Sequence, residues 1–202
     1  MIERLQRRGA RGLRVIDFAS GGGRNGDALR NAGFDVVTID DQTAMGDLPL
    51  RAVEGSFAAV ISTHGLLHGT VDAIAERVAL FARGLEREGL LFATLGSTRD
   101  ARFAKGRRIG ASTYVPLDGD ERGVAHTYFT RSQLEQLLDP WYEVESLEER
   151  LVDGVAGRWA HATTPLAQAV HWFLEARTRF AAHPCGTPPV EIRSRIGLDA
   201  LA

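Results

Sequence analysis

A cluster of three glycines follows a short apolar segment near the start of the chain. Gly21-Gly22-Gly23 comes after residues 13–18, which have the apolar character of a strand, and residues 24–32 have the pattern of a helix. A second apolar segment, residues 35–39, ends at Asp40. Glycines in such a turn let a ligand approach the backbone, and a carboxylate after the next strand can accept both hydroxyls of a ribose. The pattern predicts a nucleotide-binding unit, although glycines that only form a tight turn would look the same.

Two histidines four residues apart follow a third apolar segment, residues 57–62. His64 and His68 would share one helical face at the carboxyl end of a strand, where open α/β sheets bind their ligands. This spacing suits two metal ligands, but the zinc-protease pattern requires a glutamate directly after the first histidine, and Gly65 stands there. We therefore expect no metal. The two histidines and His126 are candidates for substrate positioning or general-base catalysis, and hydrogen bonding within the core is the alternative.

A basic segment lies within residues 96–126, where the periodicity of helices and strands is lost. Loops of this length in a compact domain are usually functional or disordered. The cations can bind a carboxylate or phosphate of a substrate, or they can lie in solvent, balanced by the acids Asp118, Asp120 and Glu121. The basic residues are Arg99, Arg102, Lys105, Arg107 and Arg108. We expect substrate contacts from Arg99 and Arg102 and from the flanking Tyr114 and Tyr128.

The elements that must position these residues follow from the apolar pattern. Short apolar segments alternate with helical ones, which indicates an α/β fold with a mainly parallel sheet. A helix is expected over about 70–87 and a strand over 90–95. A capping box at Thr130 begins a further helix. The last strands, 142–147 and 170–176, are expected to pair antiparallel at the edge of the sheet.

Composition and charge exclude several classes of protein. The 202 residues are 44% hydrophobic and 25% charged, with a net charge of −2, which suits one domain and leaves no room for the two domains of a typical dehydrogenase. Near-neutral charge argues against a general nucleic-acid or membrane-surface binder. Cys185 is the only cysteine, so neither an intramolecular disulfide nor a cysteine-based metal cluster can form. We expect a cytoplasmic protein because no signal peptide or membrane-spanning stretch is evident, and a bacterial one because arginine almost replaces lysine.

The residues before the glycines distinguish between cofactors. In nicotinamide-binding enzymes the first glycine directly follows an uncharged strand, whereas here the segment reads Val15-Ile16-Asp17-Phe18-Ala19-Ser20-Gly21-Gly22-Gly23. It resembles the first motif of class I S-adenosylmethionine-dependent methyltransferases, with Ala19 at the position of the motif's first glycine. Further segments resemble the family in the same order: residues 33–40, 46–50, 56–62, 88–94 and 126–130. The nearest likeness is to small bacterial members of the tellurite-resistance and ubiquinone-biosynthesis types.

This resemblance implies a Rossmann-like sheet, S-adenosylmethionine as the cofactor and methyl transfer to a small-molecule acceptor. It further implies that Asp17 braces the glycine loop or reaches the cofactor's amino group through water, that the Ala19 carbonyl accepts from that amino group and that Asp40 holds the ribose. An alanine should be tolerated at position 19 if the backbone there keeps φ below zero. The residues expected to bind the cofactor are Asp17, Ala19, Ser20, Gly21, Gly23, Arg24, Asp40, Asp41, Asp47, Leu48, Ser62 and Thr63.

The family's third strand and its helix have little room in this chain. Only residues 41–56 separate the second and third apolar segments, and a parallel crossover with a helix takes a dozen residues or more. We expect the edge strand and its helix to be shortened or missing, which would bare a strand edge that a homodimer or the C-terminal tail could cover. One methyltransferase domain is expected over 1–180, followed by a proline-rich tail over 181–202.

Two other functions fit part of the sequence. One is a nicotinamide-binding Rossmann oxidoreductase, against which Asp17 and the lack of a substrate domain speak. The other is a non-catalytic, degenerate methyltransferase-like binding domain that lost cofactor binding together with its adenine wall. A nucleic-acid methyltransferase is not expected, because the chain has no Asn-Pro-Pro-Tyr motif and no separate recognition domain.

Overall fold

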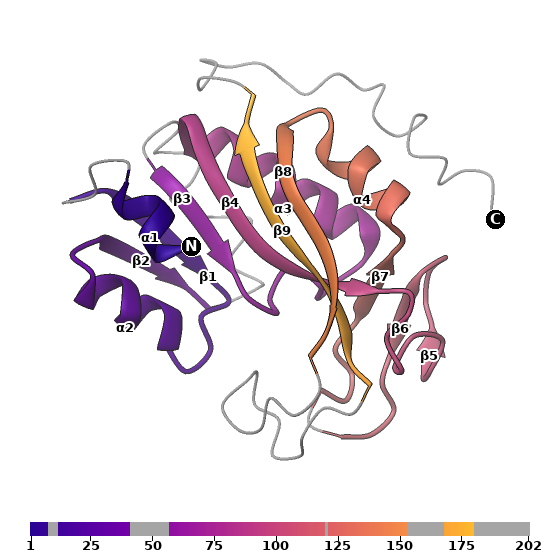
Figure 1. Ribbon diagram of the computed structural model, residues 1–202. Coiled ribbons are helices and arrows are strands. Elements are labelled where there is room, and N and C mark those ends of the chain that lie inside the picture. Colours follow the sequence, from indigo (N-terminus) through magenta and orange to yellow (C-terminus); the bar gives the residue numbers. More distant parts are fainter. Residues whose placement is uncertain (8–11, 41–56, 120, 153–167, 180–202) are drawn as a thin grey trace.

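A computed structural model describes residues 1–7, 12–40, 57–119, 121–152 and 168–179. The helices are α1 Ile2–Gln6, α2 Arg24–Asn31, α3 Val71–Gly84 and α4 Arg131–Leu138. The strands are β1 Arg14–Phe18, β2 Asp35–Ile39, β3 Phe57–Ser62, β4 Leu85–Ser97, β5 Arg107–Arg108, β6 Thr113–Val115, β7 His126–Phe129, β8 Tyr142–Leu151 and β9 Val170–Thr178. The strands form one mixed sheet, with α1 and α2 on one face and α3 and α4 on the other (Figure 1).

The central strands run parallel in the order β2-β1-β3-β4. All six residues of β3 are buried, as expected for a parallel strand with helices on both faces. Val60 packs towards α3, whereas Ala59 and Ile61 belong to the cluster on the opposite face. The chain therefore has two apolar layers, one on each side of the sheet.

A long antiparallel hairpin completes the sheet beside β4. Strand β9 pairs antiparallel with residues 90–96 of β4 and, on its other edge, with β8 (Figure 1). The indole Nε1 of Trp172 in β9 donates to the Phe129 carbonyl at 2.9 Å, which ties the hairpin to β7. The predicted α/β fold, mainly parallel with an antiparallel C-terminal hairpin, is confirmed.

The structure differs from the sequence-based prediction in two places. Helix α3 ends at Gly84, before the expected end near residue 87, and β4 begins at Leu85 and not at residue 90. Residues 86–89 form an irregular segment within this strand, where Glu88 has a φ of 58°. The segment 96–126 also contains β5 and β6, which pair with each other, and β6 pairs with β7 on its other edge. Strands of two and three residues are too short to show an alternating pattern in the sequence.

Some expectations lie outside the described residues. These are the shortened third strand and helix at 41–56, and the tail at 181–202. Within the described part of the chain, β2 is the last strand on its side of the sheet. No helix among the described residues is long and apolar enough to cross a membrane.

Candidate functional site

The glycine turn joins β1 to α2 at the carboxyl end of the sheet. Gly21 and Gly23 have φ values of 53° and 75°, a left-handed conformation that glycine adopts without strain. Ala19 also has a positive φ, 54°, and its N–H donates to the Ile39 carbonyl at 2.6 Å. The condition for an unstrained alanine, a negative φ, is therefore not met, and Ala19 occupies a backbone conformation that the family's glycine suits better.

Asp40, directly after β2, binds this turn. Its Oδ1 accepts hydrogen bonds from the Ser20 hydroxyl at 2.5 Å and from the Gly21 N–H at 2.9 Å. Asp40 is exposed. Because both bonds use Oδ1, the other carboxylate oxygen keeps capacity to accept from a ligand hydroxyl.

Asp17, the acid within β1, is fully buried beneath the turn. A Cβ added to Gly26 in the first turns of α2 would lie 3.1 Å from its Oδ2. Burial raises the pKa of Asp17, and a hydrogen bond from the Gly26 N–H partly opposes that rise. This placement fits a side chain that braces the strand-to-helix turn.

The turn after β3 packs against the glycine turn. The Asn25 amide at the start of α2 donates to the Thr63 hydroxyl at 2.6 Å. Gly65 in the turn after β3 lies so close to Ala19 in the glycine turn that a Cβ added to Gly65 would be 2.2 Å from the Ala19 Cβ. Ser62, also in this region, is buried. Two segments about forty residues apart in the sequence therefore form one surface at the ends of β1 and β3.

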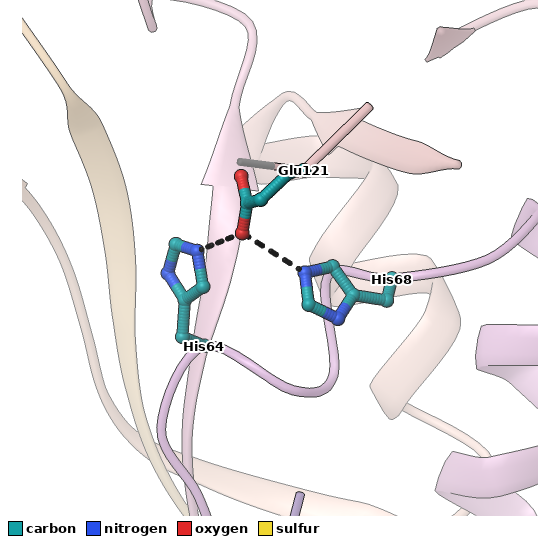
Figure 2. Close-up of side chains that lie close together, drawn as sticks. All are labelled: His64, His68 and Glu121. Carbon is teal, nitrogen blue, oxygen red and sulfur yellow. Dashed lines mark hydrogen bonds and ion pairs between the residues drawn. The ribbon is translucent and has the colours of Figure 1, made fainter. Parts of the chain in front are cut away.

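His64 and His68 in this turn converge on Glu121 (Figure 2). Glu121 Oε1 lies 3.1 Å from His64 Nε2 and 3.5 Å from His68 Nε2. The two imidazole rings have their centroids 5.6 Å apart and stand edge to face. His64 has a φ of 70°, and its N–H donates to the Thr94 hydroxyl at 2.7 Å. A non-glycine residue with this φ is strained and persists only where its surroundings hold it.

The second oxygen of Glu121 faces the nitrogen atoms of two further side chains. Oε2 lies 3.1 Å from His126 Nε2 and 3.5 Å from Arg102 NH1. Burial alone would raise the pKa of Glu121, but the hydrogen bonds of His126, His64 and His68 hold it well below its usual range. Glu121 is therefore a carboxylate surrounded by nitrogen atoms. Burial lowers the pKa of His68, although Glu121 opposes that effect.

Arg102 links Glu121 to a buried pair behind it. Its guanidinium forms two hydrogen bonds with Asp100, at 2.9 and 3.1 Å, and it lies 3.0 Å from His171 Nε2. Burial opposes the ionisation of Asp100, but bonds from Arg102 and from the Val170 N–H outweigh it, so the pKa of Asp100 is lowered. Burial and the nearby charges of His64 and Arg102 lower the pKa of His171 to about 3, so it is neutral at pH 7.

Backbone pairing holds the histidine turn against β7. His68 and His126 form an antiparallel bridge, and the Gly69 N–H donates to the Ala125 carbonyl at 2.8 Å. The buried Arg77 of α3 donates to the His68 carbonyl. The Thr127 hydroxyl binds the Gly69 carbonyl at 2.6 Å. The side chains around Glu121 therefore project from segments fixed to the sheet.

Three aromatic side chains from the segment 96–126 and from β7 pack together. The rings of Phe103, Tyr114 and Tyr128 have centroids 5.5 to 6.3 Å apart. Burial raises the pKa of Tyr128 well above its usual range, so its hydroxyl stays protonated. Both tyrosines predicted to contact substrate thus belong to one cluster.

The structure brings most of the predicted residues to one end of the sheet. Asp17, Ala19, Ser20, Gly21, Gly23, Asp40, Ser62 and Thr63 surround the glycine turn, and His64, His68, His126 and Arg102 surround Glu121. Arg24 is exposed at the first residue of α2. Arg99 points elsewhere: its side chain is 76% exposed and pairs with Glu149. Asp41, Asp47 and Leu48 lie outside the described residues.

Two members of the site were missed by sequence reasoning. Glu121 was interpreted as a surface acid that balances the arginines, and His171 was not among the candidate site residues. Glu121 meets His64 across 57 positions of the sequence, and it stands in a segment without periodicity. We find no sequence signal that would have identified either residue.

Comparisons with known proteins agree with this geometry. No protein-family model and no curated protein sequence matches the chain. Solved structures do match. A SAM-dependent methyltransferase from Methanosarcina mazei has a TM-score of 0.62 at 14% identity, over 82% of this chain and 92% of that one.

Two further similar structures also contain a methyltransferase fold. The 1,6-didemethyltoxoflavin-N1-methyltransferase of Burkholderia thailandensis, solved with 1,6-didemethyltoxoflavin and S-adenosylhomocysteine, has a TM-score of 0.56 at 15% identity, over 88% of this chain and 76% of that one. A putative S-adenosylmethionine-dependent methyltransferase from Listeria monocytogenes has a TM-score of 0.57 at 11% identity, over 84% and 92%. The chain described here therefore has the Rossmann-like fold of class I S-adenosylmethionine-dependent methyltransferases.

Proposed function

We propose that this protein transfers a methyl group from S-adenosylmethionine to a small-molecule acceptor. One observation carries the proposal: the glycine turn bound by Asp40 is in direct contact, through Gly65 and Ala19, with the turn that holds the histidines. A cofactor on the glycine turn and an acceptor beside Glu121 would thus be neighbours. The fold shared with known methyltransferases supports the same conclusion.

The residues of the turn fit S-adenosylmethionine. Among the described residues, no atom outside the two chain neighbours of Gly22 lies within 4 Å of a Cβ added there, so this part of the turn has room for a ligand. Asp40 can accept from the ribose hydroxyls through its remaining carboxylate oxygen. The methionine part would lie near the start of α2, where Arg24 can meet its carboxylate.

The chemistry requires alignment and, for a protonated nucleophile, a base. The acceptor atom attacks the methyl carbon in line, the bond between that carbon and the sulfonium sulfur breaks, and S-adenosylhomocysteine leaves. A proton on the acceptor must then go to a basic group, and His64, His68 and His126 are placed to receive it. Arg102 and Tyr128 would position a small polar acceptor beside Glu121.

The cofactor assignment can be tested by calorimetric titration of S-adenosylhomocysteine. We expect binding by the wild type and about tenfold weaker binding by Asp40→Asn, because an amide oxygen accepts hydrogen bonds less strongly than a carboxylate. Asp35→Asn is the matched control, since Asp35 is an exposed acid at the amino end of the same strand. NADH titrated in parallel should not bind. Binding of NADH alone would establish the oxidoreductase alternative, and binding of neither ligand would favour the non-catalytic one.

A further inference from the structure

The donor atoms around Glu121 have the arrangement of a metal centre. His64, His68 and Glu121 each offer one ligand atom, and these atoms lie within 4.8 Å of one another. Their side chains are 6%, 14% and 21% exposed. The group is therefore shielded from bulk water, and it can still be reached by a small molecule.

The two distances measured from Glu121 Oε1 agree with tetrahedral coordination. Bonds of about 2.0–2.1 Å from Zn²⁺ to imidazole nitrogen and carboxylate oxygen place neighbouring ligand atoms roughly 3.3 Å apart. The two distances from Glu121 Oε1, 3.1 Å to His64 Nε2 and 3.5 Å to His68 Nε2, lie on either side of that value. Figure 2 shows that both histidines are directed at the same carboxylate oxygen of Glu121, which comes from a separate segment of the chain.

The second oxygen of Glu121 has the outer contacts that metal-bound carboxylates usually have. His126 and Arg102 lie 3.1 and 3.5 Å from Oε2. The Nδ1 of His126 lies 2.9 Å from the Val124 carbonyl and so carries a proton. These contacts orient Glu121 so that Oε1 faces the two histidines, as outer residues do at known metal sites.

We propose that His64, His68 and Glu121 bind a divalent transition-metal ion, with Zn²⁺ the best match, and leave a fourth position open. Two imidazoles and one carboxylate form a donor set that suits zinc and neighbouring transition metals, whereas Mg²⁺ prefers oxygen ligands. The expectation of no metal rested on the missing glutamate beside His64. In the folded chain, the loop supplies a glutamate from a distant position.

The open position gives the metal a part in the proposed methyl transfer, and this step rests on that proposed function. A hydroxyl or thiol acceptor bound there would lose its proton more easily, because the cation stabilises the anion. The resulting oxygen or sulfur anion would attack the methyl group of the sulfonium. The proton released on binding would pass to solvent or to a neighbouring base.

The test is titration of tag-free protein, stripped with a chelator, with Zn²⁺ or Co²⁺ in the absence of cofactor. We expect one ion per chain, a visible Co²⁺ spectrum typical of low coordination number, and no binding of Mg²⁺. Glu121→Gln and His68→Gln should each weaken Zn²⁺ binding by roughly 100-fold or more, as a lost ligand must cost at least what a lost outer contact costs. Glu143→Gln is the matched control, because Glu143 is an exposed glutamate of β8 that pairs with Arg177 and is not a proposed ligand.

The outcomes separate this proposal from the proposed function. Circular dichroism of each variant establishes that it is folded, and S-adenosylhomocysteine titrated into the same samples reports on the cofactor site. Zn²⁺ affinity that is equal in the wild type and in folded Glu121→Gln and His68→Gln would overturn the metal site, as would a wild type that binds no ion. Zn²⁺ binding without binding of S-adenosylhomocysteine would leave the metal site standing and refute the methyltransferase proposal.

Discussion

The contact between Gly65 and Ala19 predicts a large effect from a very small substitution. Gly65→Ala would place a methyl carbon 2.2 Å from the Ala19 Cβ, whereas carbon atoms in contact normally lie about 3.5–4.0 Å apart. The added carbon would also lie 3.2 Å from the Ser62 hydroxyl and 3.3 Å from the Phe18 carbonyl. One of the two turns must therefore move by more than an ångström.

Neither turn can move without breaking hydrogen bonds. The Ala19 N–H donates to the Ile39 carbonyl at 2.6 Å, and the His64 N–H donates to the Thr94 hydroxyl at 2.7 Å. Overpacking in well-packed regions costs about 1–3 kcal/mol, and we expect Gly65→Ala to lie near the upper end. At about 2–4 °C per kcal/mol for a chain of this size, the melting temperature should fall by roughly 6–12 °C.

A substitution at Ala19 tests the same contact from the other turn. Ala19→Gly removes the nearest atom and also relieves an alanine at a φ of 54°. Its own effect should stay within about 1 kcal/mol, because glycine loses more backbone entropy on folding than alanine does. In the double variant, we expect about 2 kcal/mol of the loss to be recovered.

Urea unfolding of the two single variants, the double variant and the wild type forms a double-mutant cycle. Gly22→Ala is the control, because an added Cβ there meets no atom within 4 Å and should change stability by less than about 0.5 kcal/mol. A coupling near zero would refute the packing of the two turns described above. So would a neutral Gly65→Ala.

Two further predictions concern residues that support the site. Asp100→Asn should cost roughly 3 kcal/mol in urea unfolding at pH 7, because it leaves the partly buried Arg102 guanidinium beside a buried neutral amide. Since the pKa of Asp100 is lower in the folded than in the unfolded chain, the wild type should lose this stabilisation as the pH falls below about 4, and the variant should show a shallower loss; equal slopes would contradict the ion pair. Thr130→Ala removes the capping box with Gln133 at the start of α4 and should cost about 1 kcal/mol, measured as a fall of roughly 2–4 °C in melting temperature. Ser132→Ala, on the same exposed turn, should leave that temperature nearly unchanged.

Much of the fold could be predicted because its cause is local. Strand β3 is apolar at nearly every position, and all its residues are buried, since a parallel strand between two layers of helices meets no solvent. The capping box at Thr130 began α4 where expected, because the side-chain bonds that define it join residues three apart. The Rossmann-like, mainly parallel sheet followed from the resemblance to a known family.

The geometry of the site was not predictable in the same way. Arg99 and Arg102 are equivalent in the sequence, on either side of Asp100, yet Arg99 pairs with Glu149 at the surface and Arg102 turns inward to Asp100 and His171. The difference comes from β8 and β9, which reach this region from some fifty and seventy positions away. Side chains three residues apart in a loop have no fixed relative direction until other elements pack on them.

The sequence by itself determined the α/β class, the strand-to-helix glycine turn and the acid that follows β2, because burial patterns and turn chemistry act over a few residues. Only the tertiary structure decided that His64 and His68 face Glu121, with His126 and Arg102 behind it. The physical reason is that these residues meet through the pairing of the histidine turn with β7 and the seating of the loop before it. Those contacts depend on the register of the whole sheet, and no local pattern encodes them.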